Sequence, residues 1–293
     1  MTRDARPARD RAGRWTRRRR VVQLSVAAFY LALPFANLMG FEKVVGTLSS
    51  LKVGPMDLTE PAAGLSAALA AGRLTTTLVL GVAPVVLLAL VLGPVFCSWA
   101  CPWGLVSEGI DALRQRVRPR AWASRSWVPV RRLRWATLVG VLALGALLGS
   151  PIAALVSAPR LASTLPMEAI FLKVVSPVTG GLLLGLAFLE AFGPRRLWCR
   201  ALCPVGALAN FLRTPRTLKV GYDQGRCLHP RVPICHSACS WGLDPRAIGR
   251  FDACSNCLAC VEHCPSGALR PVFVPRPAGP PGSVRGGDGG PEA

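Results

Sequence analysis

The chain has 293 residues, of which 51% are hydrophobic and only 17% are charged, and its formal net charge is +20. The hydrophobic residues form long uninterrupted blocks, which argues against an ordinary soluble domain and indicates a polytopic membrane protein. Such a charge could indicate nucleic-acid binding, but the arginines cluster beside the apolar blocks and no nucleic-acid-binding motif accompanies them. Most of the 11 cysteines have metal-ligand spacing, which favours a reducing compartment over a disulfide framework.

Residues 1–20 form a basic segment with nine arginines and two acidic residues. An apolar block, residues 21–40, follows directly, so the positive-inside rule predicts a cytoplasmic N-terminus. A secretory or twin-arginine signal is the alternative, because it also places arginine before an apolar run. The block is 20 residues long and has no clear small-x-small cleavage site, which favours a retained membrane helix.

Three further apolar blocks follow, at residues 74–96, 135–156 and 169–193. Each block is long enough to cross about 30 Å of hydrocarbon, so we expect four transmembrane helices. Lys173 and Glu190 near the ends of the last block would reach the membrane interface. The loop at residues 97–134 carries eight arginines, which predicts that both chain termini lie in the cytoplasm.

A cysteine pair follows the second and the fourth predicted helix. Cys97 and Cys101 form the first pair, Cys199 and Cys203 form the second, and each pair reads C-x3-C-P. Each cysteine of the second pair lies 102 residues after its counterpart, which indicates a duplicated helical hairpin. We expect the four thiolates to meet at the cytoplasmic face, where they would bind a metal cluster or act as redox thiols. The alternative is a structural role for Cys-Pro turns at helix ends.

Four cysteines near the C-terminus have the spacing of bacterial ferredoxins, C-x2-C-x2-C-x3-C-P: Cys254, Cys257, Cys260 and Cys264. In such a run the thiolates hold a [4Fe-4S] cluster, and the last cysteine often binds a second cluster. A zinc site would need two separated pairs of ligands. The run therefore predicts an iron–sulfur cluster and an electron-transfer role.

Three earlier cysteines, Cys227, Cys235 and Cys239, have the irregular spacing C-x7-C-x3-C and no following proline. If fourth ligands are exchanged as in two-cluster ferredoxins, Cys239 joins the first three cysteines of the ferredoxin run around one cluster. Cys264 then joins Cys227 and Cys235 around another. The module would hold two [4Fe-4S] clusters.

The second of these clusters would lack a fourth thiolate. His229, His236 or a water could complete it, or the position could stay open and give a labile or three-iron cluster. Alternatively, the ferredoxin run binds a single cluster and the three earlier cysteines are structural. We expect no haem, because the sequence has no C-x-x-C-H motif and its three histidines lie outside the predicted helices.

These elements divide the chain into a basic cytoplasmic segment (1–20), a membrane domain (21–205), a ferredoxin-type module (206–270) and a Pro/Gly-rich tail (271–293). We expect the tail to be disordered. The fold class is mainly α: four transmembrane helices from a duplicated hairpin, with a small α+β ferredoxin-like module. Quinone chemistry would need a proton acceptor, and Glu60 at the non-cytoplasmic surface is a candidate, although a solvated loop acid is the simpler interpretation.

From about residue 21 to residue 270 the chain resembles the NapH family, the membrane-bound ferredoxin-type subunits of periplasmic nitrate reductase systems. The related MauN proteins, encoded with methylamine dehydrogenase, are similar. The resemblance is carried by the two C-x3-C-P pairs at helix exits, the cluster module, and Leu58-Thr59-Glu60-Pro61 before the second helix. It implies a multi-pass protein of the bacterial inner membrane with two cytoplasmic [4Fe-4S] clusters. The chain departs from the family in its first cluster motif, which lacks one cysteine and the proline.

The expected function is relay of electrons between the quinone pool, or a cytoplasmic donor, and a partner oxidoreductase or cytochrome in the periplasm. A second ferredoxin-type subunit is the partner that the resemblance implies. The chain would be an electron-transfer subunit, for example part of a quinol dehydrogenase, more than a stand-alone enzyme. The alternatives are a factor that supplies electrons for assembly of a partner redox enzyme, as in the MauN resemblance, and a membrane anchor with a structural cluster.

Overall fold

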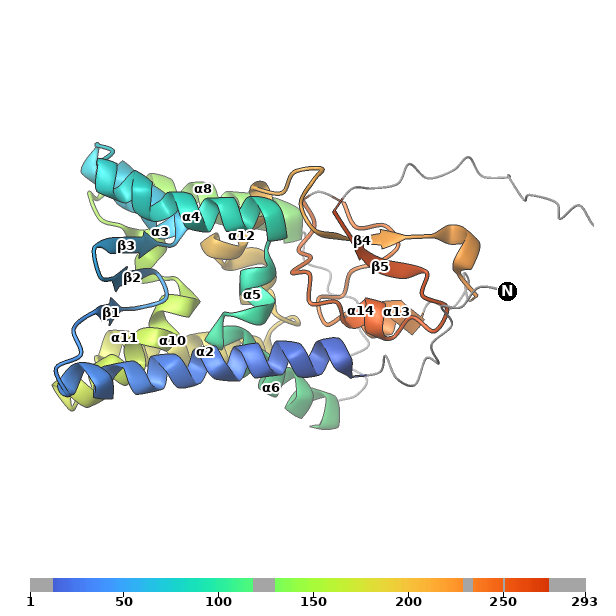
Figure 1. Cartoon of the computed structure of the whole chain (residues 1–293), viewed down its shortest axis with the longest axis horizontal. Helices are drawn as coiled ribbons and strands as arrows, with labels where there is room; N and C mark the ends of the chain where they lie inside the picture. Colours follow the sequence, from blue (N-terminus) through green and yellow to red (C-terminus); the bar gives the residue numbers. More distant parts are fainter. Residues whose placement is uncertain (1–12, 118–129, 229–233, 250, 274–293) are drawn as a thin grey trace, which may run out of the picture.

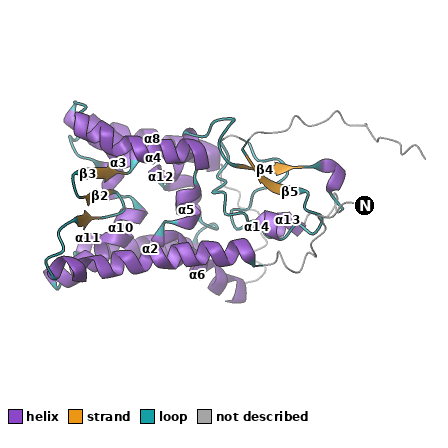
Figure 2. Ribbon diagram, viewed as in Figure 1, coloured by secondary structure: helices purple, strands orange, loops and turns teal. Residues whose placement is uncertain are grey.

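The computed structural model describes residues 13–117, 130–228, 234–249 and 251–273. Within these residues helices dominate, and the strands are confined to two small sheets at opposite ends of the molecule (Figure 2). The longer helices are α2 (Arg14–Leu38), α3 (Pro61–Ala71), α4 (Thr76–Leu92), α6 (Pro102–Val117), α8 (Val130–Leu147), α10 (Ala158–Met167), α11 (Pro177–Phe192) and α12 (Pro204–Phe211). The shorter helical segments are α5 (Val95–Trp99), α9 (Ile152–Leu155), η1 (Glu168–Leu172), η2 (Trp198–Leu202), η3 (Gln224–Arg226), α13 (Ile234–Ser237) and α14 (Ala259–Glu262).

Helices occupy all four apolar blocks, but three of them are shorter than predicted. Helix α4 ends before Gly93, whose φ of 71° is left-handed. The last block is interrupted, because η1 ends at Lys173 with φ 53° and α11 begins at Pro177. Among the described helices, α2 alone is both long and apolar enough to cross a membrane by length and composition, whereas α3, α4 and α11 are apolar but shorter. Hydropathy reports composition and misses these local backbone breaks.

Helix α2 begins at Arg14, so most of the arginine run is helical and continues directly into the apolar segment. It lies along one side of the molecule, opposite α4 and α8 (Figure 1). Arg19 and Gln23 on this helix are buried. The amide of Gln23 donates a hydrogen bond of 2.9 Å to the carbonyl of Ser98, which fixes α2 against α5.

Helices α3 and α4 form a hairpin with well-defined ends. Glu60 caps α3, accepting hydrogen bonds from the N–H groups of Ala62 and Ala63, and Pro61 is its first residue. Gly72 ends α3 with a φ of 63°, as a left-handed C-cap residue commonly does. The turn then returns the chain through α4 toward the cysteine pairs.

The segment between α2 and α3 is an antiparallel sheet of β1 (Val44–Gly46), β2 (Ser50–Val53) and β3 (Met56–Thr59). The sheet lies between the long helices at the end away from the second sheet (Figure 1). Strand β3 packs closely on α4, since a Cβ on Gly81 would lie 2.0 Å from the carbonyl oxygen of Asp57. This close approach carries the start of α3 into the protein interior.

The C-terminal module contains the second sheet, in which β4 (Lys219–Tyr222) pairs antiparallel with β5 (Leu269–Val272). Helices α13 and α14 lie beside this sheet (Figure 1). The sequence places the start of the tail at residue 271, but Pro271 and Val272 belong to β5. Residues 274–293 of the predicted tail, and residues 1–12 of the basic segment, lie outside the described residues.

Candidate metal centres

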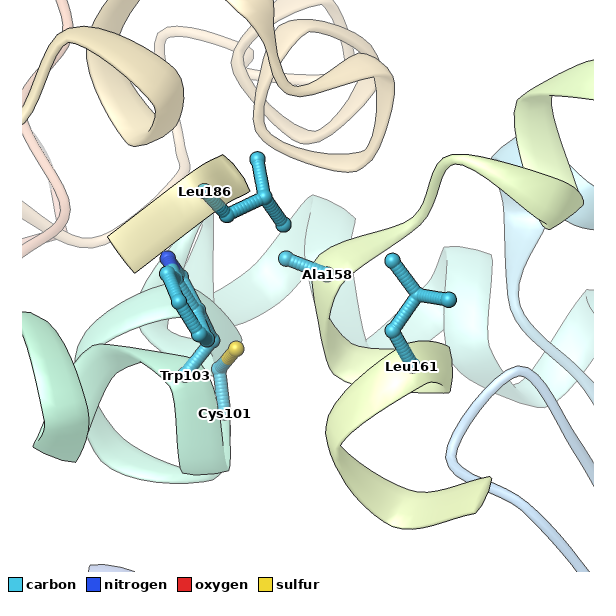
Figure 3. Packing of buried hydrophobic residues seen from close by; sticks show 5 residues of the cluster. All are labelled: Cys101, Trp103, Ala158, Leu161 and Leu186. Atoms are coloured by element: carbon cyan, nitrogen blue, oxygen red, sulfur yellow. The ribbon is translucent and has the colours of Figure 1, made fainter. Parts of the chain in front are cut away.

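The two C-x3-C-P pairs meet inside the helical part of the protein. Cys97 lies on α5 and Cys101 just before α6, while Cys199 lies on η2 and Cys203 just before α12. Cys97 is within electrostatic range of Cys101 and Cys203, and Cys199 is within range of the same two thiols. We call these four residues the membrane-side thiol group. Cys101 packs with Trp103 in a buried apolar cluster that includes Ala158, Leu161 and Leu186 (Figure 3).

Each pair is followed by a proline that starts a helix. A glycine in the first turn of that helix lets the helix lie close to the first cysteine of the pair. A Cβ on Gly104 would lie 2.8 Å from the carbonyl oxygen of Cys97, and one on Gly206 would lie 3.4 Å from that of Cys199. The N–H groups at the start of α6 donate to Cys101, and those at the start of α12 donate to Cys203. A helix N-terminus stabilises negative charge, so both helices favour thiolates here.

Buried ion pairs hold the second cysteine pair against the first. The guanidinium of Arg196, just before η2, lies 2.6 Å from Asp111 and 4.0 Å from Glu108 on α6. Glu108 also lies 3.1 Å from Arg19 on α2. Since breaking a buried ion pair costs about 3–5 kcal/mol, this network fixes how the duplicated halves meet.

A second group of thiols encloses a cavity in the C-terminal module. Cys239, Cys254, Cys257 and Cys260 line it, and its empty volume, including space open to solvent, is about 330 Å³. We call them the inner thiol group. They are within electrostatic range of one another. This grouping is the one that an exchange of fourth ligands predicts.

The backbone around the inner group is shaped to wrap these sulfurs. Asn256 and Leu258 have left-handed φ values of 52° and 60°, which turn the chain sharply between successive cysteines. Backbone N–H groups donate to Cys239, Cys254 and Cys260, as they do around cluster ligands. Burial raises the pKa of the Cys254 thiol to about 12, so bound metal would have to displace its proton.

Cys227, Cys235 and Cys264 form an outer thiol group that is only half-buried. Cys235 is within electrostatic range of Cys264, and Tyr222 at the end of β4 hydrogen-bonds to Cys227 and interacts with Cys235. Tyr222 has no spacing signal in the sequence, because it reaches this group through the pairing of β4 with β5. Of the two histidines considered as ligands, His229 lies outside the described residues.

The other histidine, His236, follows Cys235 on α13 and acts electrostatically on Asp244. No three His, Cys, Asp or Glu side chains of the described residues lie close enough to share one metal ion. A cube places its irons at separate corners, so its thiolates stand farther apart than the ligands of a single zinc. The donors of each thiol group are cysteines, the residue type whose thiolates hold iron–sulfur clusters.

The three thiol groups follow one another through direct contacts. On α5, beside Cys97, the hydroxyl of Ser98 donates a 2.7 Å hydrogen bond to the carbonyl of Ser255, and the indole of Trp99 donates one of 3.2 Å to that of Asn256. Cys199 packs in the same apolar cluster as the inner cysteines Cys239 and Cys257, and inner Cys260 packs with outer Cys235 and Cys264. The order is membrane-side, inner, outer.

Two carboxylates lie where the sequence analysis did not expect them. Glu60 is 7% exposed and acts electrostatically on Cys97 and Cys203, so the interpretation of Glu60 as a solvated loop acid at the surface is wrong. The reason is the β1–β3 sheet, which folds back between the helices. Glu190 is 1% exposed beside Arg196 and Cys199, so it is not an interfacial residue. Lys173 is exposed, and its place at the membrane interface stays a prediction.

Two family models, each described as a 4Fe-4S binding domain, match the chain. One matches residues 74–120 and again residues 175–221, and the other matches residues 250–270. The first model thus covers both C-x3-C-P pairs, and the second covers the ferredoxin run. These matches and the clustered thiols identify the chain as a [4Fe-4S] cluster protein, the class that the sequence predicted.

The curated relatives of the chain include several ferredoxin-type proteins. The methylamine utilization ferredoxin-type protein MauN of Methylobacillus flagellatus is 30% identical over 262 residues, which are 86% of this chain and 76% of the relative. The ferredoxin-type protein NapH of Escherichia coli is 28% identical over 268 residues, 87% of this chain and 88% of the relative. No solved structure matches the chain significantly. The chain belongs to the NapH/MauN family of ferredoxin-type iron–sulfur proteins.

Proposed function

We propose that the chain is a membrane-bound relay in which electrons pass through clusters on the membrane-side, inner and outer thiol groups. The observation that carries the proposal is the continuous order of the three groups, joined through α5 and the packed cysteines. Electron tunnelling slows steeply with distance, so clusters in contact through a few side chains exchange electrons efficiently. Membership of a ferredoxin-type family supports electron transfer as the role.

A [4Fe-4S] cluster supplies a reversible one-electron couple, and this chain's residues hold and shield it. The membrane-side and inner groups each offer four thiolates with backbone N–H donors. Trp241, Leu243 and Leu258 line the inner cavity and would exclude water, which lowers the local dielectric and helps to set the potential. At the outer group, which offers three thiols, Tyr222 hydrogen-bonds to Cys227.

The four helices α2, α4, α8 and α11 would span the membrane, with both termini and the cluster module in the cytoplasm. Their outward faces carry exposed large apolar side chains, among them Leu24, Leu31, Leu87, Leu184 and Phe188, and a surface this apolar needs lipid or a partner. Helix α4 has 17 residues and would be about 26 Å long. A bilayer can thin locally to match so short a helix.

The proposed division keeps a membrane domain, a cluster module and basic and Pro/Gly-rich ends. Helix α12 packs in the cluster of Ala62, Cys203 and Val205, so we assign it to the membrane domain. The module then begins near Thr217, which is tied to α4 by a 2.7 Å hydrogen bond to the carbonyl of Leu90.

The proposed donor is quinol or a cytoplasmic reductant, and the acceptor is a periplasmic oxidoreductase or cytochrome reached through a second ferredoxin-type subunit. Glu60 supports a quinol reaction near the membrane-side group, because it is buried and within electrostatic range of Cys97 and Cys203. Burial raises its pKa to about 7, which suits proton transfer near neutral pH.

Removing one ligand of the inner thiol group tests the relay. Full-length protein purified anaerobically is mixed with a quinol analogue, and reduction of each cluster is followed by EPR after rapid freezing. Cys254→Ser, which removes an inner ligand, should leave the membrane-side cluster reducible and stop reduction of the outer cluster. Dithionite, which reacts from solution, should still reduce the outer cluster. Normal quinol-driven reduction of the outer cluster in this variant would contradict the relay.

The second candidate is a factor that supplies electrons for assembly of a partner redox enzyme. It is favoured by the relatives named methylamine utilization ferredoxin-type proteins. In a deletion strain the relay and the assembly roles differ in one respect. Artificial electron donors restore activity of the partner enzyme if the chain is a relay, whereas they fail if the enzyme was never completed.

A further inference from the structure

A positive charge lies inside the helical part and forms no salt bridge with a carboxylate of the described residues. Arg134 on α8 is only 3% exposed. None of the salt bridges between described residues includes it. A buried ion costs several kcal/mol unless an opposite charge and hydrogen bonds compensate it. The position of Arg134 therefore calls for a counter-charge.

The guanidinium is held by one half of the duplicated hairpin and faces both halves. Its Nε donates a 2.8 Å hydrogen bond to the carbonyl of Arg200, and its Nη2 donates to the same oxygen. Arg200 lies on η2 between the cysteines of the second pair. The remaining nitrogen, Nη1, is buried and has no hydrogen-bond partner among the described residues. The charge of Arg134 acts on Cys97 of the first pair and on Cys203 of the second.

Neighbouring charges do not neutralise Arg134. Asp252 is within electrostatic range, but its Oδ2 accepts a 2.7 Å hydrogen bond from the N–H of Gly249 and forms no salt bridge with the guanidinium. Arg200 is itself 8% exposed and adds a second positive charge. The other charges that act on Arg134 are those of the Cys97 and Cys203 thiols.

We propose that Arg134 is the counter-charge of a cluster on the membrane-side thiol group and raises its reduction potential. A [4Fe-4S] cube with four thiolates has a net negative charge, and reduction adds one electron to its irons and so one further negative charge. A fixed cation stabilises the more negative state. The guanidinium keeps its protons and forms no bond to the cluster, so the step moves an electron alone. The inference rests on the proposed function, because it needs a cluster on these cysteines.

The test is a redox titration of the full-length protein in detergent, followed by EPR. The membrane-side signal is first assigned by its loss in the double variant C97S/C203S. Arg134→Gln removes the charge and keeps a donor for the carbonyl of Arg200, whereas Arg134→Lys keeps the charge. Arg132→Gln is the matched control, since Arg132 is exposed on the same helix. We expect a more negative potential for R134Q at unchanged iron content, and potentials near the wild type for R134K and R132Q.

Each outcome bears on the inference. An unshifted potential in iron-replete R134Q overturns it, as does a shift in R134K as large as that in R134Q. If R134Q loses the cluster, the R134K variant separates the two explanations. Iron content and potential near the wild type in R134K support the counter-charge, whereas their loss in R134K means that the guanidinium has a structural role. A C97S/C203S variant that keeps all its iron contradicts the membrane-side cluster itself, which is a separate failure of the proposed function.

Discussion

The membrane-side and outer thiol groups are both built from cysteines, but the protein surrounds them differently. The membrane-side group takes two thiols from each half of a duplicated hairpin. In each half, backbone N–H groups at the start of the helix that follows the cysteine pair donate to the second cysteine of that pair. The outer group has three half-buried thiols on short segments and a tyrosine beside them. A duplication supplies ligands in symmetric pairs, so losing one would open a buried site. A cluster on the outer group would have one position without a thiolate, which solvent can reach because the three thiols are only half-buried.

The largest expected contrast is in iron content and stability. Cys101→Ser, in the buried membrane-side group, should remove about four iron atoms per chain and lower the thermal unfolding temperature, because a buried site loses its cluster. Cys264→Ser should remove the outer iron and leave the melting of the helical part unchanged. Iron and labile-sulfide counts with calorimetry on anaerobic protein measure both effects. Equal destabilisation by the two variants would remove the contrast.

The next contrast is in resistance to oxidants. A cluster on the outer group would have only three thiolates, so it should lose iron to ferricyanide before clusters on the other two groups do. Tyr222→Phe removes the hydroxyl that hydrogen-bonds to Cys227 and should speed this loss severalfold, without affecting the membrane-side signal. The control is Tyr30→Phe, which changes the other tyrosine of the chain, on α2. EPR of three-iron and four-iron signals follows the loss of iron. An unchanged rate of iron loss in Y222F would show that Tyr222 does not protect a cluster on the outer group.

Local spacing carried most of what the sequence could predict. The ferredoxin run fixes which cysteines surround the inner cavity, and Cys239 joins them as the exchange of fourth ligands predicts. The 102-residue offset predicts the convergence of the two pairs, because each pair sits at the same point of a repeated hairpin. These signals are short-range or exactly periodic, so they need no knowledge of how distant segments pack.

Residues that reach the sites through tertiary packing could not be predicted. Tyr222 depends on the register of β4 with β5, and Arg134 depends on how α8 meets η2. Glu60 and Glu190 were predicted to be near solvent because acids in apolar sequences usually are, but the folded-back sheet and the buried ion pairs enclose them. The predicted helix lengths were wrong for a related reason. Gly93 and Lys173 end helices by their backbone conformation, within segments whose hydropathy is continuous.

A pH effect should separate the two groups further. The pKa of Glu60 is raised by burial to about 7, so its carboxyl is neutral below that pH and negative above it. Negative charge beside Cys97 and Cys203 opposes addition of an electron, so the membrane-side potential should fall as the pH rises through about 7. The outer potential should not follow. Redox titrations at three pH values measure the slope, which Glu60→Gln should abolish and the control Glu42→Gln, at an exposed residue of the same loop, should keep.

The smallest expected effect distinguishes the two halves of the membrane-side group itself. A Cβ at position 104 would lie 2.8 Å from a backbone oxygen, whereas one at position 206 would lie 3.4 Å from the equivalent atom. Gly104→Ala must therefore push α6 away from Cys97 and should cost about 1–3 kcal/mol, while Gly206→Ala should cost less than about 1 kcal/mol. Thermal unfolding of the two variants measures the difference. If the two alanine variants lose the same free energy of unfolding, the two halves are packed equally closely. The N–H donors of α6 and α12 would then lie equally close to their sulfurs.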